Sequence, residues 1–216
     1  MLTLSLDPRG TRALEVLCLG AHCDDIEIGS GAALMHLAAQ RPLNVTWTIL
    51  CSDATRARET RRSAQLFLRQ ARMKRVLIES FRDGFLPAQW ANVKERIEAL
   101  KQLPRPDLIF THERDDRHQD HRIVCELTWN TFRDHLILEY EIAKFDGGLN
   151  QPNLYIPVGA KLAERKWRQL TRAYRSQAGN HWFTADAVRG MMAVRGIECR
   201  APSGFAEAFH ARKLTL

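Results

Sequence analysis

The sequence predicts an α/β fold with a mostly parallel sheet and helices on both of its faces. Two observations predict it. Short apolar runs of strand length alternate with longer segments in which apolar residues recur at the helical period. The length of 216 residues, with 45% hydrophobic and 26% charged side chains, fits one soluble globular domain over residues 1–216. Strands that alternate with helices favour right-handed βαβ units and hence a parallel sheet.

The elements follow in order along the chain. Four strands are expected over residues 13–20, 45–51, 75–80 and 107–111, with helices between them over residues 31–40, 56–71 and 93–103. A helix over 120–134 and a strand over 136–143 come next. The Gly- and Pro-containing segment 145–157 is expected to form a loop. Helices over 161–178 and 185–195 are expected to complete the same domain.

Composition and charge exclude several classes of protein. The formal net charge is +7, and the basic residues are densest in segments 56–75 and 161–175. We interpret both as solvated helix faces, so no nucleic-acid partner is needed to explain the charge. No apolar run reaches the length of a transmembrane segment, and residues 1–10 lack the basic-then-apolar pattern of a secretory signal. Five cysteines without a CxxC pair fit a reduced compartment. We therefore expect a cytoplasmic protein.

Two polar clusters follow expected strands. His22-Cys23-Asp24-Asp25 comes after the first strand, and His118-Gln119-Asp120-His121 follows the fourth. In open α/β sheets, ligands bind at the carboxyl ends of strands. His22, Asp25 and His121 would give two imidazoles and one carboxylate, a set that binds catalytic zinc and leaves a position for water. The alternative is that these side chains only cap helices or accept hydrogen bonds.

The remaining polar residues of the clusters suggest roles in catalysis. Asp24 would be a general base beside metal-activated water. His118 would stabilise an oxyanion or protonate the leaving group, and Asp120 would fix its tautomer. Cys23 as a thiolate ligand or nucleophile is a weaker alternative, because no separate base for it is evident. The other histidines, including His112, lack ligand spacing, and a structural role is expected for His112.

With these motifs the chain resembles the PIG-L/LmbE-like family of zinc-dependent N-deacetylases. The first family motif, Ala-His-Pro-Asp-Asp, corresponds to residues 21–25, and the second, His-Pro-Asp-His, to residues 118–121. Weaker similarities lie at Arg56–Glu59, at residues 83–86 and at residues 206–209. Cys23 and Gln119 replace the prolines of the two motifs, which removes no ligand. No Tyr precedes the second motif, and Tyr155 is a distant candidate for that role.

The resemblance implies a Rossmann-like fold and hydrolysis of an acetamide. The implied metal ligands are His22, Asp25 and His121, with Asp24 as base and with His118 and Asp120 assisting. The implied cofactor is Zn²⁺, with Fe²⁺ or another divalent ion as alternatives.

The substrate would be a small acetylated amino sugar or sugar conjugate, with an anionic form among the candidates. Its candidate contacts are Arg56, Glu59 and Asp83. The alternatives are structural: Arg56 and Glu59 would form a simple ion pair, and Asp83 would shape a turn. Competing functions are hydrolysis of a thiol conjugate or cyclic amide, a non-catalytic nucleotide-binding module, and an inactive member of the fold. Glu207 is expected to hold the C-terminal segment in place.

Overall fold

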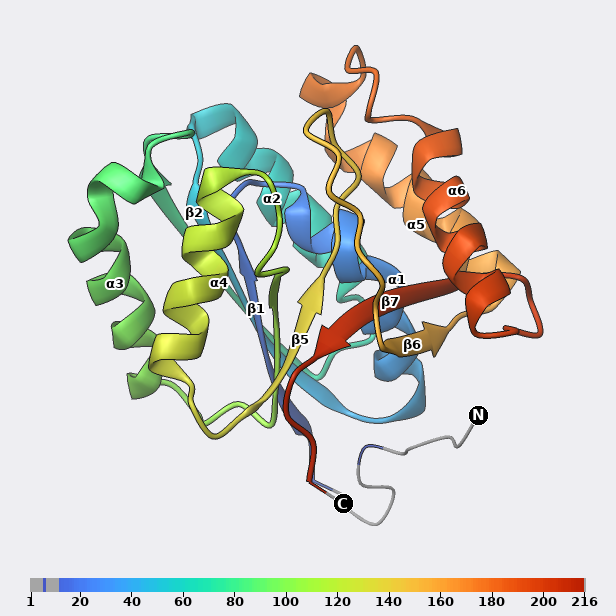
Figure 1. Cartoon of the computed structure of the whole chain (residues 1–216), viewed down its shortest axis with the longest axis horizontal. Helices are drawn as coiled ribbons and strands as arrows, with labels where there is room; N and C mark the ends of the chain where they lie inside the picture. Colours follow the sequence, from blue (N-terminus) through green and yellow to red (C-terminus); the bar gives the residue numbers. More distant parts are fainter. Residues whose placement is uncertain (1–5, 7–11, 216) are drawn as a thin grey trace.

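A seven-stranded sheet in the order β3-β2-β1-β4-β5-β7-β6 forms the centre of the protein (Figure 1). The computed structural model describes Leu6 and residues 12–215. The strands are β1 Leu14–Gly20, β2 Leu43–Cys51, β3 Met73–Phe81, β4 Leu108–His112, β5 Leu136–Tyr140, β6 Leu154–Pro157 and β7 Ala206–Ala211. The first five strands are parallel to one another, while β7 runs antiparallel to both β5 and β6. The prediction of a single α/β domain with a mostly parallel sheet is confirmed.

Helices cover both faces of this sheet (Figure 1). They are α1 Asp25–Gln40, α2 Ala54–Phe67, α3 Trp90–Ala99, α4 Gln119–Thr131, α5 Ala160–Ala173 and α6 Ala185–Glu198. Alternate residues of β1 face the two cores: Val16 packs with residues of α1, α2 and α5, and Leu17 packs with residues of α3 and α4. This alternation is the two-residue period of a strand that is buried on both sides.

The predicted elements are all present, with shifted ends. Helix α1 begins at Asp25, earlier than expected, and α5 ends at Ala173 before a single 3-10 turn, Arg175–Gln177. Strand β5 ends at Tyr140. Segment 145–157, expected as a loop, contains β6, and β7 was not expected. Both are short strands that pair mainly with each other at the end of the sheet, so no long apolar run marks them. The expectation for residues 1–10 falls outside the described residues except at Leu6.

Two glycines let α1 lie close to its neighbours. A Cβ atom on Gly29 would come within 2.2 Å of the Tyr140 ring, and one on Gly31 would come within 2.5 Å of the Phe67 ring. Glycine is therefore required at both positions for the close packing of α1 under β5 and α2. This explains Gly29-Ser30-Gly31 as a packing feature of the helix that begins at the candidate site.

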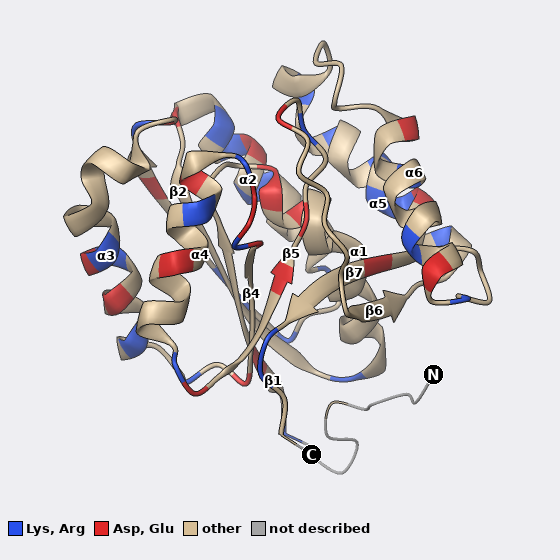
Figure 2. Cartoon of the chain, viewed as in Figure 1, with Lys and Arg blue, Asp and Glu red and all other residues tan. Residues whose placement is uncertain are grey.

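The two basic segments of the sequence form helices α2 and α5, whose Lys and Arg residues are marked in Figure 2. Both helices bury an apolar side: Ala64 and Phe67 in α2, and Ala163 and Leu170 in α5. Most of their cationic residues are exposed, whereas Lys166 of α5 is buried. Among the described residues, no helix is long and apolar enough to cross a membrane.

Candidate metal centre

The two polar clusters meet at the point where the order of the strands reverses. From β1 the chain moves to β2 and then β3 on one side, and it returns to β4 on the other side of β1. This switch point is where open α/β sheets bind ligands. Asp24 is the N-cap residue of α1, directly after β1, and His118 is the N-cap residue of α4, which follows β4. Strands far apart in the sequence thus bring both clusters together.

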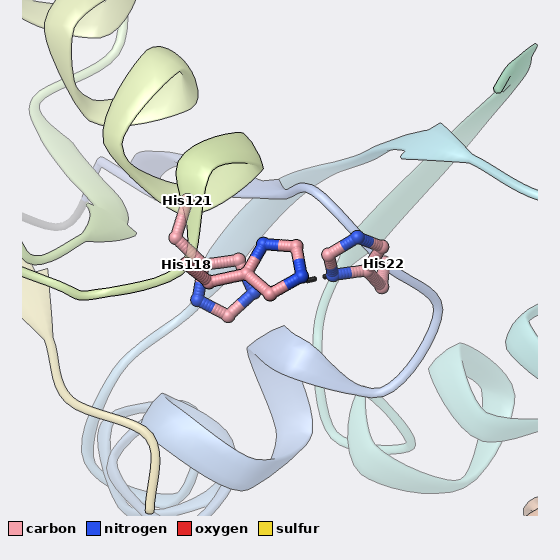
Figure 3. A group of neighbouring side chains, drawn as sticks. All are labelled: His22, His118 and His121. Carbon is pink, nitrogen blue, oxygen red and sulfur yellow. Dashed lines mark hydrogen bonds between the residues drawn. The ribbon is translucent and has the colours of Figure 1, made fainter. Parts of the chain in front are cut away.

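The three expected ligands converge on a common point. His22 Nδ1 lies 3.2 Å from His121 Nε2 and 3.4 Å from Asp25 Oδ2, and His121 Nε2 lies 3.6 Å from Asp25 Oδ1. Ligand atoms bound tetrahedrally to zinc at 2.0–2.1 Å would be about 3.3 Å apart. The spacing therefore fits one divalent cation. Figure 3 shows the rings of His22 and His121 pointing toward each other, with His118 beside them.

Asp25 is held as a carboxylate by the groups around it. Its Oδ2 accepts a hydrogen bond from the His22 backbone N–H at 2.6 Å and lies 3.1 Å from His112 Nε2. Burial alone would raise the pKa of Asp25, but the imidazoles of His121, His112 and His22 hold it well below its usual value. The side chain is thus ionised at neutral pH, as metal binding requires.

His22 directs its other ring nitrogen toward two carboxylates. Nε2 lies 3.2 Å from Asp120 Oδ2 and 3.1 Å from Asp83 Oδ1. Burial would lower the pKa of His22, yet Asp25, Asp120 and Asp83 raise it well above its usual value. Without a metal the ring therefore carries protons on both nitrogens, and a bound cation would replace the proton of Nδ1 while the proton of Nε2 stays directed at the carboxylates. Carboxylates commonly orient metal-binding histidines in this way.

Asp120 therefore contacts a different imidazole from the one expected. Its carboxylate accepts hydrogen bonds from the Gly84 N–H at 2.7 Å and the Leu86 N–H at 3.0 Å, besides its contact with His22. Only its backbone N–H reaches His118, donating to Nδ1 at 3.3 Å. The carboxylate of Asp120 thus orients His22, and the tautomer of His118 is instead set by the N–H that its Nδ1 accepts.

Sequence reasoning missed Asp116, which supports the third ligand. Asp116 Oδ2 lies 2.9 Å from His121 Nδ1 and 2.7 Å from Lys144 Nζ. Burial and the neighbouring His112 lower the pKa of His121 to about 3, so this ring is neutral. With its Nδ1–H donated to Asp116, His121 presents Nε2 as the lone-pair atom. The position of Asp116 two residues before the second motif was the available indication.

We expect Asp116→Asn to weaken metal binding about 10–100-fold, the usual scale for loss of such a support. An Asn amide donor facing Nδ1 would favour the tautomer with its proton on Nε2, which cannot bind metal. Chelator competition with zinc measures the affinity. Asp115→Asn is the matched control, since the Asp115 side chain is 70% exposed and its nearest cation is Arg212 at 4.0 Å. Equal affinities for the two variants would contradict the role of Asp116.

Asp24 has one engaged and one unpartnered oxygen. Oδ1 lies 3.1 Å from an Arg56 guanidinium nitrogen, whereas Oδ2 is buried without a hydrogen-bond partner among the described residues. Burial raises the pKa of Asp24 to about 6, and Arg56 opposes this rise. A carboxylate of this pKa is mostly ionised at pH 7 and is still basic enough to take a proton.

His118 lies at the edge of the centre. Its ring meets the His22 ring edge-on, with the centroids 4.9 Å apart. Burial and the charge of His22 lower the pKa of His118. Because Nδ1 accepts the Asp120 N–H, Nε2 carries the proton and is a hydrogen-bond donor. The side chains of His22, His118 and His121 are also close enough to bind one metal ion, but that ligand set would contain no carboxylate.

His112, expected to be structural, lies beneath the centre. Its Nε2 accepts the Ala21 N–H at 3.0 Å, and its ring stacks on His121 at 3.8 Å. The hydroxyl of Tyr140, another residue that sequence reasoning missed, donates to Leu19 O and lies 3.2 Å from His112 Nε2. Asp25, His112 and His121 are close enough to hold a metal, but the lone pair of His112 Nε2 is already engaged.

The cysteines near the centre are protonated thiols. Cys23 is buried, and its Sγ lies 3.4 Å from Cys51 O and 3.3 Å from Ser52 Oγ. Burial raises the pKa of Cys23 and raises that of Cys51 to about 12. Cys51, His22 and Asp120 are close enough to bind one metal ion, yet a thiol with a pKa of about 12 is a poor ligand at neutral pH. Cys18 is a core residue.

The expected substrate contacts lie at different distances from the centre. Asp83, 77% exposed, touches His22, and Arg56 touches Asp24. Both oxygens of Glu59 accept hydrogen bonds from Ser176, at 2.9 Å from N–H and 2.6 Å from Oγ. The Tyr155 hydroxyl contacts Pro152, Gln151 and Glu198, and none of the candidate site residues.

A buried carboxyl supports the first motif from below. The Tyr174 hydroxyl contacts both Cys23 O and Glu27 Oε1. One hydroxyl proton cannot serve both oxygens, so a protonated Glu27 completes the pair by donating to Tyr174. Burial accordingly raises the pKa of Glu27 to about 8. Tyr174 was not singled out from the sequence.

Fold and site together define an α/β class of protein with a candidate metal centre at the switch point of its sheet. The model of the family "PIG-L: GlcNAc-PI de-N-acetylase" matches residues 17–132. The chain therefore belongs to the PIG-L family of de-N-acetylases. The match includes both His motifs and every candidate ligand.

Solved structures share this fold. N,N'-diacetylchitobiose deacetylase from Pyrococcus horikoshii is 21% identical, with a TM-score of 0.74 over 92% of this chain and 84% of that one. The conserved protein TT1542 from Thermus thermophilus is 21% identical, with a TM-score of 0.71 over 94% and 96%. GalB, the 4-carboxy-2-hydroxymuconate hydratase from Pseudomonas putida KT2440, is 13% identical, with a TM-score of 0.66 over 94% and 98%. At these identities the likeness shows the fold, and a hydratase among the three shows that fold alone does not fix the reaction.

Proposed function

We propose that this protein is a metal-dependent N-deacetylase that hydrolyses the acetamide of an amino sugar or amino-sugar conjugate. The observation that carries the proposal is the triangle of His22 Nδ1, His121 Nε2 and the Asp25 carboxylate, with sides of 3.2–3.6 Å. Membership in a family of de-N-acetylases and the fold shared with a chitobiose deacetylase support the acetamide as substrate. We propose Zn²⁺ as the metal, with Fe²⁺ as the alternative.

The donor set fits such an ion. Two neutral imidazole nitrogens and one carboxylate match the ligands of catalytic zinc sites, which keep one position for water. The buried, unpartnered Oδ2 of Asp24 beside this set is the group that a water there would contact. A divalent cation bound by the three residues supplies Lewis-acid activation of the amide carbonyl and of water.

Two different residues of the chain carry out the two proton transfers of the reaction. Asp24 takes the proton of the attacking water as the new C–O bond forms. His118, with its proton on Nε2, donates a hydrogen bond to the developing oxyanion or a proton to the amine as the C–N bond breaks. Asp120 and Asp116 keep His22 and His121 in the tautomers that bind the metal. The products are acetate and the free amine.

The rim of the centre is suited to a polar substrate. We propose that Asp83 accepts hydrogen bonds from sugar hydroxyls, since its carboxylate is 77% exposed beside His22. Arg56 would bind an anionic group of the substrate while it holds Asp24. Both carboxylate oxygens of Glu59 accept hydrogen bonds from Ser176. We therefore propose that Glu59 positions the segment after α5 and does not contact the substrate.

His121→Ala is expected to release the metal and abolish acetate production, because one of three protein ligands and its support from Asp116 are lost together. Metal content per protein and acetate release from N-acetylated sugars measure both effects. His181→Ala is the matched control, since His181 is exposed and lies outside the centre. A stoichiometric metal content in His121→Ala would show that the ligand set is wrong.

A substrate screen separates the proposal from its closest competitor. N-acetylated sugars, nucleotide sugars and glycosides are compared with thiol-conjugate amides and cyclic amides at equal concentration. Turnover of the non-acetyl amides alone would replace the deacetylase by another amide hydrolase on the same centre.

We propose the cytoplasm as the location. The five cysteines are free and buried thiols, which fits a reduced compartment. Fractionation of cells that produce the protein tests this proposal.

A further inference from the structure

The positive charge of the chain is concentrated in two helical segments. Residues 54–75 and 160–175 contain fourteen of the 32 Lys and Arg residues and only two of the 25 Asp and Glu residues. The remainder of the chain is therefore net acidic, although the whole carries +7. These segments are about a hundred residues apart in sequence, and they contain α2 and α5.

The fold places the two segments side by side. Gln169 of α5 donates to Leu66 O of α2 at 3.1 Å, and Ser176 after α5 donates to Glu59 of α2 at 2.6 Å. Leu66 and Glu59 are two turns apart in α2, whereas Gln169 lies near the end of α5 and Ser176 lies just beyond it. The C-terminal part of α5 and the segment after it thus run beside α2, and their outer sides adjoin there.

The exposed cations of both helices are arranged in stripes on this surface. Arg58 and Arg62 in α2, and Arg168 and Arg172 in α5, are four residues apart and therefore lie on one side of their helix. Arg69 lies in the turn that follows α2, and Arg175 lies in the 3-10 turn that follows α5. The α5 stripe is opposite Leu170 and the α2 stripe is opposite Phe67, both of which are buried in the core. We call this surface the basic face, and it consists of the exposed residues Arg58, Arg62, Arg69, Arg168, Arg172 and Arg175.

The carboxylates near the basic face are engaged elsewhere. Glu59 is hydrogen-bonded to Ser176, and Glu164 forms an ion pair with Arg189 at 3.1 Å. Within the described part of the chain, no ion pair involves any of the six arginines of the basic face. Their charges therefore add to a local positive field, which the Asp53 carboxylate reduces near Arg58.

We propose that the basic face docks the protein on the surface of an anionic phospholipid bilayer. Guanidinium groups bind phosphate oxygens in bidentate fashion, and all six cations of the face are arginines. Two adjacent helices offer a broad surface for many headgroups at once. The cytoplasmic leaflet carries the negative potential that attracts such a surface.

The face lacks the features that would favour nucleic acid. Base stacking requires exposed aromatic rings between the cations. The aromatic residues of α2 and α5 are Phe67, which is buried, and Trp167, which packs against Phe183 with ring centroids 5.5 Å apart. Charge without stacking suits a layer of phosphate headgroups.

The basic face also begins at the rim of the candidate metal centre. Arg56, in the first turn of α2, touches Asp24. Ser176, directly after Arg175, is hydrogen-bonded to Glu59, which directly follows Arg58 in α2. Docking through this face would hold the rim near the lipid surface. Binding itself requires neither metal nor turnover, so this inference stands or falls separately from the proposed function.

Sedimentation with vesicles tests the inference. Full-length protein is mixed with vesicles of phosphatidylcholine alone or of equimolar phosphatidylcholine and phosphatidylglycerol. The test variant changes Arg62, Arg69, Arg168 and Arg172 to Gln. The matched control removes four exposed cations from the other side of the sheet by changing Arg96, Lys101, Arg105 and Arg133 to Gln. Circular dichroism confirms that each variant is folded.

We expect the wild type and the control variant to bind the anionic vesicles, less tightly as salt is raised, and to leave neutral vesicles unbound. The basic-face variant should lose on the order of several hundredfold in partitioning, at about fivefold per cation. Equal binding of neutral and anionic vesicles, or equal loss in both variants, would overturn the inference. So would binding of duplex DNA at the same salt with no binding of vesicles. Deacetylation of a soluble substrate should be unchanged in the basic-face variant.

Discussion

Replacing Asp24 with Asn is expected to lower kcat by about 10²–10⁴-fold while the metal stays bound, because general-base catalysis contributes on that scale. Asn has the same shape as Asp and cannot accept a proton at neutral pH. The buried Oδ2 has no partner among the described residues, and Oδ1 already contacts Arg56. No other carboxylate combines this position with a pKa raised to about 6 by burial within the described centre.

The measurement is acetate release under saturating substrate, together with metal content. Asp53→Asn is the matched control, because Asp53 is exposed and caps α2 through Thr55 N–H at 2.7 Å and Arg56 N–H at 2.8 Å. Asn serves as a cap as well as Asp does, so kcat should not change. A kcat near that of the wild type in Asp24→Asn would remove Asp24 from the mechanism. Loss of metal in that variant would instead make Asp24 part of the ligand set.

The sequence predicted the fold well where periodicity was strong. The five parallel strands and six helices were all expected, because each combines a buried side with the period of its element. Strands β6 and β7 escaped prediction, since each is defined by antiparallel pairing with a strand far away in sequence and not by a long apolar run. The early start of α1 at Asp25 was hidden because its first turn carries the polar residues of the candidate site.

The candidate site was predictable only where residues are adjacent in sequence. His22 with Asp25, and His118 with His121, stand in short motifs at strand ends, and the structure brings them together. Three further residues lie beneath the candidate metal position: His112 at the end of β4, Tyr140 at the end of β5, and Asp116 in the loop before α4. No local pattern links them to it. The partner of the Asp120 carboxylate could likewise be learned only from the three-dimensional arrangement, which places His22 rather than His118 beside it.

Glu207→Gln is expected to lower the free energy of unfolding by about 3–5 kcal/mol, because it leaves the Lys166 ammonium buried without its counter-ion. The Lys166 and Glu207 side chains are only 2% and 3% exposed, and Nζ lies 2.6 Å from Oε1. Glu207 also accepts the Ala32 N–H at 3.0 Å and the Ala33 N–H at 2.6 Å, so it joins β7 to the middle of α1. This is the structural role expected for Glu207 from the sequence.

Urea unfolding of Glu207→Gln, Lys166→Met and the double variant measures the coupling between the two side chains. The double variant should lose less stability than the two single losses combined, since removing both charges leaves no unpaired ion. Glu164→Gln is the matched control. Glu164 forms an ion pair with Arg189, and the two side chains are 46% and 50% exposed, respectively. Exposed ion pairs of this kind contribute about 0–1 kcal/mol to stability. Equal losses for Glu207→Gln and Glu164→Gln would show that β7 is held to α1 by apolar packing alone, with the buried ion pair adding nothing.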